Sequence, residues 1–580
     1  MQASRRTRIA TGIPLFLALC AVFLILNRAA YKGYFQDDEL DNISWAPRAP
    51  METWVRGFLT PRFDADNFRP TGHLYFAEMG KHFGLDFPKY VIPIHLLHLL
   101  NAGMVWLLAR KVQAGRLAAW SAAVFFALNV AAFDAYWKPM YVFDVMCASF
   151  CLLSILLFAH ERWILSFLAF WLAYKSKELA VMLPAVLAAY EYWFGKRRWK
   201  PLAPFFLISA SFGMQGILLN PNKDNDYTFR FSLAALKTTV PFYSSRLLLI
   251  PYGGVAILAL ALLRDRRIRF GIAAMCLFFL PLIFLPGRLF PAYCYLPLTG
   301  VSIAVAGLIS LGETAHPRAI VPVVIILFAI WMRRDIQELR RDRSGTLAAD
   351  NGARAFVTAI QNYAKAHPKP RTVVYDSVPP GLHHWGVTAA VNIAYHQSGM
   401  ESRFIDSPEA REALKHGPVT FMSWDEQERR VHFTARDGDA NEAAYITMGH
   451  DTPPWQLVSG WLGIDGYFQW IEPQAIAYLR RPPDASKFEL NVNVSPELIR
   501  KTGHSKVEVR LNGVTIGAKD FTAAGWQRGV WALPEGHAGH TGQTGQTRVD
   551  FLVSPGFPAD SNNKRVGIAI VSFGFLPPER

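Results

Sequence analysis

The sequence predicts a multi-spanning α-helical membrane protein that is followed by a soluble α/β module and a β-sandwich. Three observations support this fold class. Of the 580 residues, 52% are hydrophobic and only 18% are charged, which is unusually apolar for a soluble chain of this length. Apolar runs long enough to cross a bilayer core of about 30 Å recur as far as Met332. After Asp335 the apolar runs shorten, and charged residues, Gly and Pro become frequent.

About eleven transmembrane helices are expected within residues 1–335. The first follows three arginines and has no small-residue cleavage site after it, so we interpret it as an uncleaved span and not as a signal peptide. The expected spans are 9–29, 90–110, 117–134, 140–159, 162–175, 178–195, 201–219, 244–263, 270–287, 289–311 and 317–333.

Short basic loops between the spans predict their orientation. These loops cover residues 5–8, 110–116, 196–200 and 264–269. Because Lys and Arg are enriched in cytoplasmic loops, we expect a cytoplasmic N-terminus. An odd number of spans then places residues after Trp331 on the extracytoplasmic side of a bacterial inner membrane, together with the long loop 30–89. The formal charge of +15 thus needs no nucleic-acid partner.

The remainder of the chain divides into two soluble regions that differ in their pattern of apolar and polar residues. Residues 336–455 predict an α/β module with a helix over 336–366 and a first strand over 371–376. Residues 456–580 predict a β-sandwich, because Phe488, Leu490, Val492 and Val494 alternate with polar residues. Further strands are expected at 507–511, 549–553 and 566–575, with a hairpin turn at 512–513 and a loop over 536–546.

The densest acidic cluster of the first half lies just beyond the first span, where Asp37, Asp38 and Glu39 are adjacent. Neighbouring carboxylates at a membrane–water boundary repel one another, which raises the pKa of one of them or recruits a metal. Such a cluster is suited to a general base. The alternative is a solvated loop that is acidic by chance.

Arg69 stands in the same outer loop and is followed by Pro70. The planar guanidinium binds two phosphate oxygens at once, so Arg69 is a candidate phosphate ligand at the mouth of the helical bundle. The alternative is an interfacial arginine that reaches toward lipid headgroups.

Other ionisable residues are expected at the outer ends of helices. They are Asp134, Lys138, Asp144 and the run from Lys175 to Glu178. Charged groups at membrane depth are costly unless they are paired or functional. His95 and His98 have helical spacing but no third ligand nearby in sequence, which favours packing over metal binding.

The order of these motifs resembles the GT-C class of membrane glycosyltransferases, which use polyprenyl-phosphate-linked sugars. Within that class it is most similar to the branch of protein O-mannosyltransferases and tetratricopeptide-type O-mannosyltransferases. The matching elements are Asp37-Asp38, Phe68-Arg69-Pro70, His98-Leu99-Leu100-Asn101, Asp144, Lys177-Glu178 and Tyr293-Cys294-Tyr295-Leu296-Pro297. Those relatives carry an arginine directly before the last element, whereas Ala292 stands here and Arg288 is the nearest arginine. No tetratricopeptide repeats follow.

The resemblance implies an inverting transfer of a sugar from a polyprenyl phosphate to an acceptor hydroxyl of a protein, lipid or polysaccharide. It implies that Asp37 is the base and that Asp38 supports it or shares a divalent metal. Arg69, Lys138 and Arg288 are the implied ligands of the donor phosphate. Asp144, Glu178 and His73 are the implied groups that orient the acceptor or a basic residue.

The terminal sandwich resembles the carbohydrate-binding-module-like jelly rolls that are appended to bacterial glycosyltransferases. The similarity rests on Gly460-Trp461, Trp470, Gly525-Trp526, Leu533-Pro534 and the segment 564–568. Trp526 and Trp531 are candidates for stacking on sugar rings, and packing in the sandwich core is the alternative for both.

Two other functions fit the same sequence. One is a polymerase or ligase of the O-antigen type that acts on lipid-linked glycan. The other is a non-catalytic lipid or polysaccharide translocase with glycan-binding outer domains. A translocase would carry acidic residues along a path through the spans, whereas most acidic residues here are expected at one face.

Overall fold

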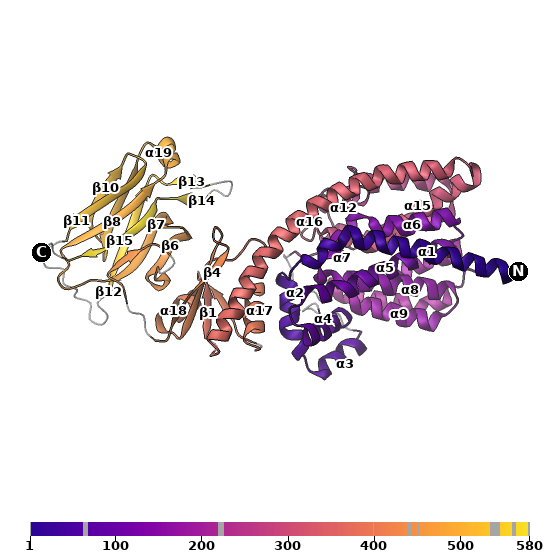
Figure 1. Cartoon of the computed structure of the whole chain (residues 1–580), viewed down its shortest axis with the longest axis horizontal. Coiled ribbons are helices and arrows are strands. Elements are labelled where there is room, and N and C mark those ends of the chain that lie inside the picture. Colours follow the sequence, from indigo (N-terminus) through magenta and orange to yellow (C-terminus); the bar gives the residue numbers. More distant parts are fainter. Residues whose placement is uncertain are drawn as a thin grey trace. The chain divides into compact units, whose positions relative to one another are not determined.

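The structure is a computed structural model that describes residues 2–61, 68–218, 226–369, 371–397, 399–405, 407–438, 442–449, 452–533, 546–559 and 564–577. Contacts divide the chain into two compact units, Met1–Arg354 and Ala355–Arg580, and each is described by itself. Helices build the first unit, whereas β-sheets with a few short helices build most of the second (Figure 1).

Sixteen α-helices occur among the residues described up to Ala366. The short ones are α2 (Asp37–Trp45), α3 (Met51–Leu59), α7 (Phe133–Trp137) and α13 (Gly253–Leu258). The others are α1 (Gln2–Asn27), α4 (Pro70–Phe83), α5 (Phe87–Lys111), α6 (Arg116–Leu128), α8 (Val142–Ala159), α9 (Trp163–Ser176), α10 (Leu183–Trp193), α11 (Ala203–Leu218), α12 (Leu233–Leu248), α14 (Arg266–Phe279), α15 (Tyr295–Ala315) and α16 (Ile320–Ala366). Several begin at residues suited to helix starts, such as Pro70 in α4 and the capping carboxylate of Asp265 before α14.

Six helical segments in the described part of the chain are long and apolar enough to cross a membrane, or eight if each of two bent pairs counts as one span. The bent pairs are Arg116–Leu128 with Val130–Trp137, and Leu233–Leu248 with Gly253–Leu263. The expected number of eleven is therefore not confirmed. Three expected spans account for the difference. Two of them are the short helices α9, with 14 residues, and α10, with 11 residues. The third is the apolar first part of α16, which extends only to the residue before Arg333.

The basic loops gather at one end of the first unit. Arg267 donates from Nη1 to the carbonyl oxygen of Gln113 at 3.3 Å, which joins the loops 264–269 and 110–116. The guanidinium of Arg266 lies 5.2 Å from the ring centroid of Phe194, next to the loop 196–200. Three basic loops that are far apart in sequence thus share one end, as the distribution of Lys and Arg predicts.

Histidine and tyrosine side chains form buried polar contacts between the helices. Tyr295 OH lies 2.8 Å from His98 Nδ1 and accepts from Asn101 Nδ2 at 3.0 Å. Tyr31 OH lies 2.9 Å from His95 Nδ1. Both histidines therefore pack against tyrosines of other segments, and this agrees with the packing role expected for them.

Two glycines let α14 and α15 approach closely. A Cβ atom added to Gly271 would lie 2.5 Å from the backbone nitrogen of Ala304, and one added to Gly300 would lie 2.5 Å from the backbone nitrogen of Met275. A side chain at either position would therefore force the two helices apart.

The second unit contains a four-stranded sheet of order β2-β1-β3-β4. Its strands are β1 (Thr372–Tyr375), β2 (Ser402–Phe404), β3 (Val419–Asp425) and β4 (Arg430–Arg436), and the helices α17 (His384–Ala394) and α18 (Pro408–His416) connect them. Strand β1 pairs in parallel with β2 and β3, whereas β4 is antiparallel to β3. The α/β pattern and the first strand agree with the sequence prediction.

A nine-stranded antiparallel sheet forms most of the rest of the second unit, together with the helix α19 (Pro496–Thr502) and a two-stranded sheet of β13 (Phe557–Ala559) and β14 (Lys564–Val566). Along its main path the order is β10-β9-β12-β7-β15-β8-β11, with β5 paired to β15 and β6 to β7. The strands are β5 (Tyr445–Thr447), β6 (Leu457–Asp465), β7 (Phe468–Arg480), β8 (Lys487–Val494), β9 (Ser505–Leu511), β10 (Val514–Phe521), β11 (Gly525–Ala532), β12 (Gln546–Ser554) and β15 (Ala569–Leu576). The antiparallel β domain is thus confirmed, and hydrogen bonds join all nine strands in one sheet.

The alternation seen in the sequence sets which face of β8 is buried. Phe488, Leu490, Val492 and Val494 are all fully buried in one apolar core. The hairpin predicted at Asn512-Gly513 joins β9 to β10, with Leu511 paired to Val514. The loop expected over 536–546 lies outside the described residues apart from Gln546, which begins β12.

Candidate active site

The acidic motif forms the first turn of the short helix α2. Asp37, Asp38 and Glu39 occupy its first positions, where carboxylates interact favourably with the free N–H groups of a helix N-terminus. Asp37 is buried with 9% of its surface exposed, whereas Asp38 is exposed. The divalent metal expected at Asp37 and Asp38 stays a prediction.

Glu39 is the fully buried acid of the motif, and its carboxylate is used for local structure. One oxygen accepts from the backbone N–H of Gln36 at 2.7 Å, and the other accepts from the backbone N–H of Met140 at 3.2 Å. Gln36 is the N-cap of α2, so Glu39 completes a capping box. Burial raises the pKa of Glu39 to about 7, although Lys138 and the two N–H donors act against this shift.

Arg69 caps the start of α4 and is held from two sides. Its Nε donates to Oε1 of Glu178 at 2.7 Å, and its backbone N–H donates to Nδ1 of His73 at 3.0 Å. Burial, assisted by the Arg69 charge, lowers the pKa of His73 to about 3. His73 is therefore neutral at pH 7, and its Nδ1 can accept the Arg69 N–H.

Lys177 and Asp144 form a buried ion pair. The Nζ atom of Lys177 lies 2.6 Å from both carboxylate oxygens of Asp144, and the two side chains are 8% and 3% exposed. The ammonium also lies 4.3 Å from the ring centroid of Tyr293. This pair joins α8 to the segment between α9 and α10.

Arg288 is held by aromatic rings. Its guanidinium lies 4.3 Å from the ring centroid of Tyr227 and 4.5 Å from that of Phe290, and Nη2 donates to the Tyr293 hydroxyl at 3.2 Å. The Nε atom is buried and makes no hydrogen bond to any described residue. No carboxylate of the described chain pairs with Arg288, which leaves its charge and one N–H donor unmatched.

These three cations line one cavity of about 410 Å³. Arg69, Lys177 and Arg288 meet there with Glu178 and Tyr293. The remaining walls are mostly apolar and consist of Leu179, Val181, Met182, Phe212, Gly213, Gly216, Ile217, Tyr227, Phe229, Phe231, Leu280, Pro281, Leu282, Phe284 and Leu285. The cavity thus has a cationic end and a long apolar surface, which suits an amphiphile with an anionic head.

Lys138 does not line this cavity. Its charge acts on the carboxylates of Glu39, Asp134, Asp342 and Asp350. Lys138 therefore interacts electrostatically with four acids and is absent from the cavity lining. Of the three phosphate ligands expected from the sequence, the structure brings Arg69 and Arg288 together and leaves Lys138 in a separate acidic environment.

Sequence reasoning did not select Lys177 or Tyr293 as site residues. Lys177 occurs in the Lys177-Glu178 motif, and Tyr293 opens the Tyr-x-Tyr-Leu-Pro element, so both were visible as motif members. Their role in the cavity depends on pairs such as Lys177 with Asp144, which are 33 residues apart in sequence. Glu39 was part of the acidic cluster, and the spacing Gln36-x-x-Glu39 was the signal for its capping role.

One group among the described residues has the geometry for a metal ion, and it does not contain Asp37 or Asp38. It consists of Asp425 at the end of β3, Glu428 in the following turn and His432 in β4, with ligand atoms within 4.8 Å of one another. Asp425 accepts the backbone N–H groups of Gln427 and Glu428 at 2.8 Å, which is the ordinary hydrogen bonding of such a turn.

The two tryptophans considered for glycan binding differ in their surroundings. Trp526 on β11 is 66% exposed. Trp531 packs against the apolar core and lies so close to Gly517 and Gly529 that a Cβ atom at either glycine would clash with its ring. Trp526 is thus the better placed of the two for a ligand, and its role in glycan binding stays a prediction.

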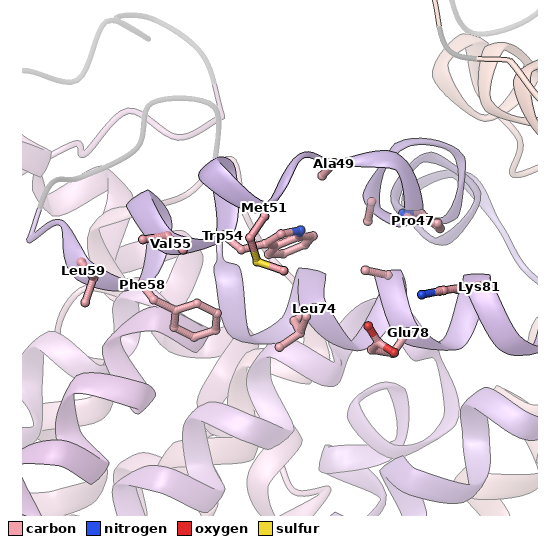
Figure 2. Close-up of a pocket in the computed structure, with 12 residues that line it drawn as sticks. Pro47, Ala49, Met51, Trp54, Val55, Phe58, Leu59, Leu74, Glu78 and Lys81 are labelled. Carbon is pink, nitrogen blue, oxygen red and sulfur yellow. The ribbon is translucent and has the colours of Figure 1, made fainter.

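A second cavity, of about 550 Å³, lies between α3 and α4 (Figure 2). Met51, Trp54 and Phe58 line it from α3, and Leu74 lines it from α4. Lys81 is its only cationic side chain, and Glu78 stands one turn away on α4. This mostly apolar groove therefore lacks the group of cations that marks the first cavity.

No protein-family model matches the chain, and no curated protein matches it. Solved structures of two proteins show a distant likeness. ArnT from Cupriavidus metallidurans in the apo state is 14% identical, with 72% of this chain and 94% of that chain covered and a TM-score of 0.42, and its complex with undecaprenyl phosphate gives 0.41. The oligosaccharyltransferase AglB from Archaeoglobus fulgidus, in complex with an inhibitory peptide and a dolichol-phosphate, is 9% identical, with 96% and 95% covered and a TM-score of 0.46.

Proposed function

We propose that this chain is a membrane glycosyltransferase that moves a sugar from a polyprenyl-phosphate-linked donor to an acceptor hydroxyl. The observation that supports this most is the cavity in which Arg69, Lys177 and Arg288 face an otherwise mostly apolar wall. A polyprenyl phosphate has the same two parts, since an anionic phosphate is joined to a long hydrocarbon chain. The motif order of the sequence points to the same chemistry independently.

In the proposed reaction an acceptor oxygen attacks the anomeric carbon of the sugar. A carbon–oxygen bond forms on one face while the bond to the phosphate oxygen breaks on the other, so the configuration inverts. The hydroxyl proton passes to the carboxylate of Asp37, and the polyprenyl phosphate leaves with the bonding electrons. The base and the cations contribute separately, by removing a proton and by stabilising the departing phosphate.

The ion pairs give each cation a distinct part in this proposal. Glu178 fixes the guanidinium of Arg69, and Asp144 fixes the ammonium of Lys177, so these cations are oriented but largely neutralised. Arg288 has no carboxylate partner in the described chain and carries an unused buried N–H. We therefore expect Arg288 to supply most of the net charge that attracts the phosphate.

The proposed reaction takes place on one side of the membrane. The cationic cavity and the acidic motif act on the extracytoplasmic face of the inner membrane, opposite the basic loops, with lipids around the helices. The acceptor is a hydroxyl of a protein, a lipid or a polysaccharide. A divalent metal at Asp37 and Asp38 is not needed for the steps above.

The test compares the glycans of cells that lack the chain with those of cells that regain it. In mass spectra, glycans of cells that lack the chain should be lighter by the mass of the transferred sugar. The wild-type chain should restore this mass, and Asp37→Asn should not. Loss of one hexose or pentose supports single-sugar transfer, whereas loss of a block of sugars indicates a polymerase or ligase. Restoration by Asp37→Asn would remove Asp37 as the base.

Binding of the carrier lipid tests the cavity separately. The purified wild-type chain should bind a polyprenyl phosphate more tightly than the polyprenol without phosphate. Arg288→Ala should lose most of this difference, at least about tenfold in affinity, which corresponds to about 1.4 kcal/mol. Arg264→Ala, an exposed arginine in a basic loop, serves as the control and should bind like wild type. Equal binding of both lipids by the wild-type chain would contradict the proposed donor.

A further inference from the structure

Helix α16 contacts the segment that leads into the acidic motif. Asp350 is 1% exposed, and both of its carboxylate oxygens accept hydrogen bonds from this segment. Oδ2 accepts the backbone N–H of Tyr34 at 3.1 Å, and Oδ1 accepts the side-chain Nε2 of Gln36 at 2.8 Å. A buried carboxylate is therefore committed to two donors that stand just before Asp37.

Arg354 stands one turn further along α16 and contacts the same segment. Its Nη2 donates to the carbonyl oxygens of Lys32 and Gly33, each at 2.7 Å. Its guanidinium also lies 5.3 Å from the ring centroid of Tyr34. Asp350 takes N–H donors and Arg354 takes carbonyl acceptors, so the two side chains together fix the segment from residue 32 to residue 36.

The backbone at Gly33 leaves no room for a side chain. A Cβ atom there would lie 3.0 Å from Oδ2 of Asp350 and 2.7 Å from the Phe87 ring. The backbone of Gly33 is extended, so the requirement for glycine is one of space and not of conformation. This close approach allows Asp350 to reach the N–H of the next residue, Tyr34.

Gln36 transmits this contact to the acidic motif. It is the N-cap of α2, its backbone N–H donates to Glu39, and its side chain is held by Asp350. Asp37 is the next residue and the first of the helix. A helix that starts at a fixed N-cap has a fixed first turn, so the position of the Asp37 carboxylate depends on where Gln36 is held.

We propose that Asp350 and Arg354 are positioning residues that hold Asp37 in place for proton removal, an inference that rests on the proposed function. Neither residue needs to touch the donor or the acceptor. Displacement of a catalytic group by about 1 Å can cost about 100-fold in rate, so loss of the contact should lower turnover more than donor binding.

Asp350→Asn is the main test. The amide keeps the shape of the side chain, but only its oxygen accepts hydrogen bonds. Its NH2 group would therefore face one of the two N–H donors and break that hydrogen bond. We expect kcat to fall about 10- to 100-fold while the KM for the lipid donor changes less than about twofold. Arg354→Ala should act in the same direction. Because both residues hold one segment, the double variant should lose less than the product of the two single losses.

Asp335→Asn is a matched control on the same helix. Asp335 is also buried, at 2% exposure, and accepts a backbone N–H at 2.9 Å, but the donor is Val130 and not a residue of the outer motif. If Asp350 only anchors α16, the two variants should lose similar thermal stability and neither should change kcat selectively. A selective loss of kcat in Asp350→Asn supports positioning, and equal kcat values in the two variants overturn it.

Amide hydrogen exchange separates this inference from the proposed function. The amides of residues 34–40 should exchange faster in Asp350→Asn and Arg354→Ala than in wild type, and Asp335→Asn should leave them unchanged. Unchanged exchange in the first two variants would overturn the positioning role whether or not sugar transfer is detected. If the wild-type chain transfers no sugar, but residues 34–40 exchange faster in these two variants, the proposed function alone is refuted.

Discussion

At the scale of single residues, the outer motif places a fully buried carboxyl group next to an exposed one. Glu39 is 1% exposed and accepts two backbone N–H groups, whereas Asp38, its neighbour, faces solvent. Adjacent acids of one helical turn therefore have different surroundings, and the carboxylate of Glu39 closes the capping box. A buried acid that titrates near neutral pH also makes stability depend on pH.

Glu39 should make the folded chain less stable as the pH rises. Burial raises the pKa of Glu39 to about 7 from an ordinary value of 4.5, so the folded chain binds this proton more tightly than the unfolded chain does. Its contribution is therefore lost as the pH rises from about 4.5 to about 7, by at most about 3 kcal/mol.

Thermal unfolding in detergent between pH 4.5 and 8, followed by tryptophan fluorescence, measures this effect. Glu39→Gln keeps the shape and removes the titration, so its unfolding temperature should fall less between pH 4.5 and 7 than that of wild type. Asp38→Asn, which changes an exposed acid of the same turn, should retain the wild-type slope. Parallel curves for Glu39→Gln and wild type would contradict the burial argument.

At the scale of elements, α14 and α15 are a pair whose spacing is set by backbone. The added Cβ atoms at Gly271 and Gly300 meet backbone atoms of the facing helix at 2.5 Å, and backbone cannot swing aside as a side chain can. Helix α15 also carries Tyr295, which bonds to His98 and Asn101 of α5. Movement of α15 relative to α14 should therefore also move Tyr293, which lies just before α15 and lines the cavity.

Gly300→Leu should destabilise the chain strongly and disturb the cavity. Overpacking a close contact costs about 1–3 kcal/mol or more, and relief requires α15 to move away from α14. We expect a lower unfolding temperature and weaker binding of polyprenyl phosphate. Gly345→Leu in α16 is the control, because no atom lies within 4 Å of the added Cβ and Gly345 does not line the cavity. Equal stability of Gly300→Leu and Gly345→Leu would contradict the tight crossing.

At the scale of the whole molecule, patterns within one segment were predictable and pairs between distant segments were not. Apolar runs predicted most helices, and the alternation around Leu490 predicted a strand, because both signals depend only on neighbouring residues. The short helices α9 and α10 were expected as full spans because hydrophobicity does not show where a chain turns. The contact of Asp350 with Gln36 joins residues 314 apart in sequence, and only tertiary packing reveals it.

In the candidate site, too, single residues could be predicted from the sequence, but the contacts between them could not. Arg69, Arg288 and Lys138 were all expected as ligands of the donor phosphate, and Arg69 and Arg288 meet in one cavity that Lys138 does not line. Charge and position in a loop identify cations near the membrane surface, but they do not show which carboxylates surround each one. The pairing of Lys177 with Asp144 likewise required the fold.

The proposed orientation can be tested by labelling cysteines from either side of the membrane. If positive loops face the cytoplasm, Lys200→Cys in the basic end should react with a membrane-impermeant maleimide only after the inner membrane is opened. Tyr467→Cys, at a position 77% exposed between β6 and β7, should react while that membrane is intact. The two positions differ because an odd number of crossings separates the N-terminus from the second unit in the expected topology.

The unmodified chain is the control, since Cys276 is exposed and reports any background labelling. The result bears on the span number, which length and composition leave at six to eight instead of the eleven expected. Opposite accessibility requires an odd number of crossings between positions 200 and 467, and the three straight candidate spans of this stretch, Lys200–Leu218, Arg266–Phe284 and Pro291–Ala315, satisfy it. If the bent pair Leu233–Leu248 with Gly253–Leu263 also crosses, the apolar start of α16 must cross as well. If both cysteines react only after the membrane is opened, the number of crossings between them is even and the second unit lies on the cytoplasmic side, which contradicts the proposed orientation.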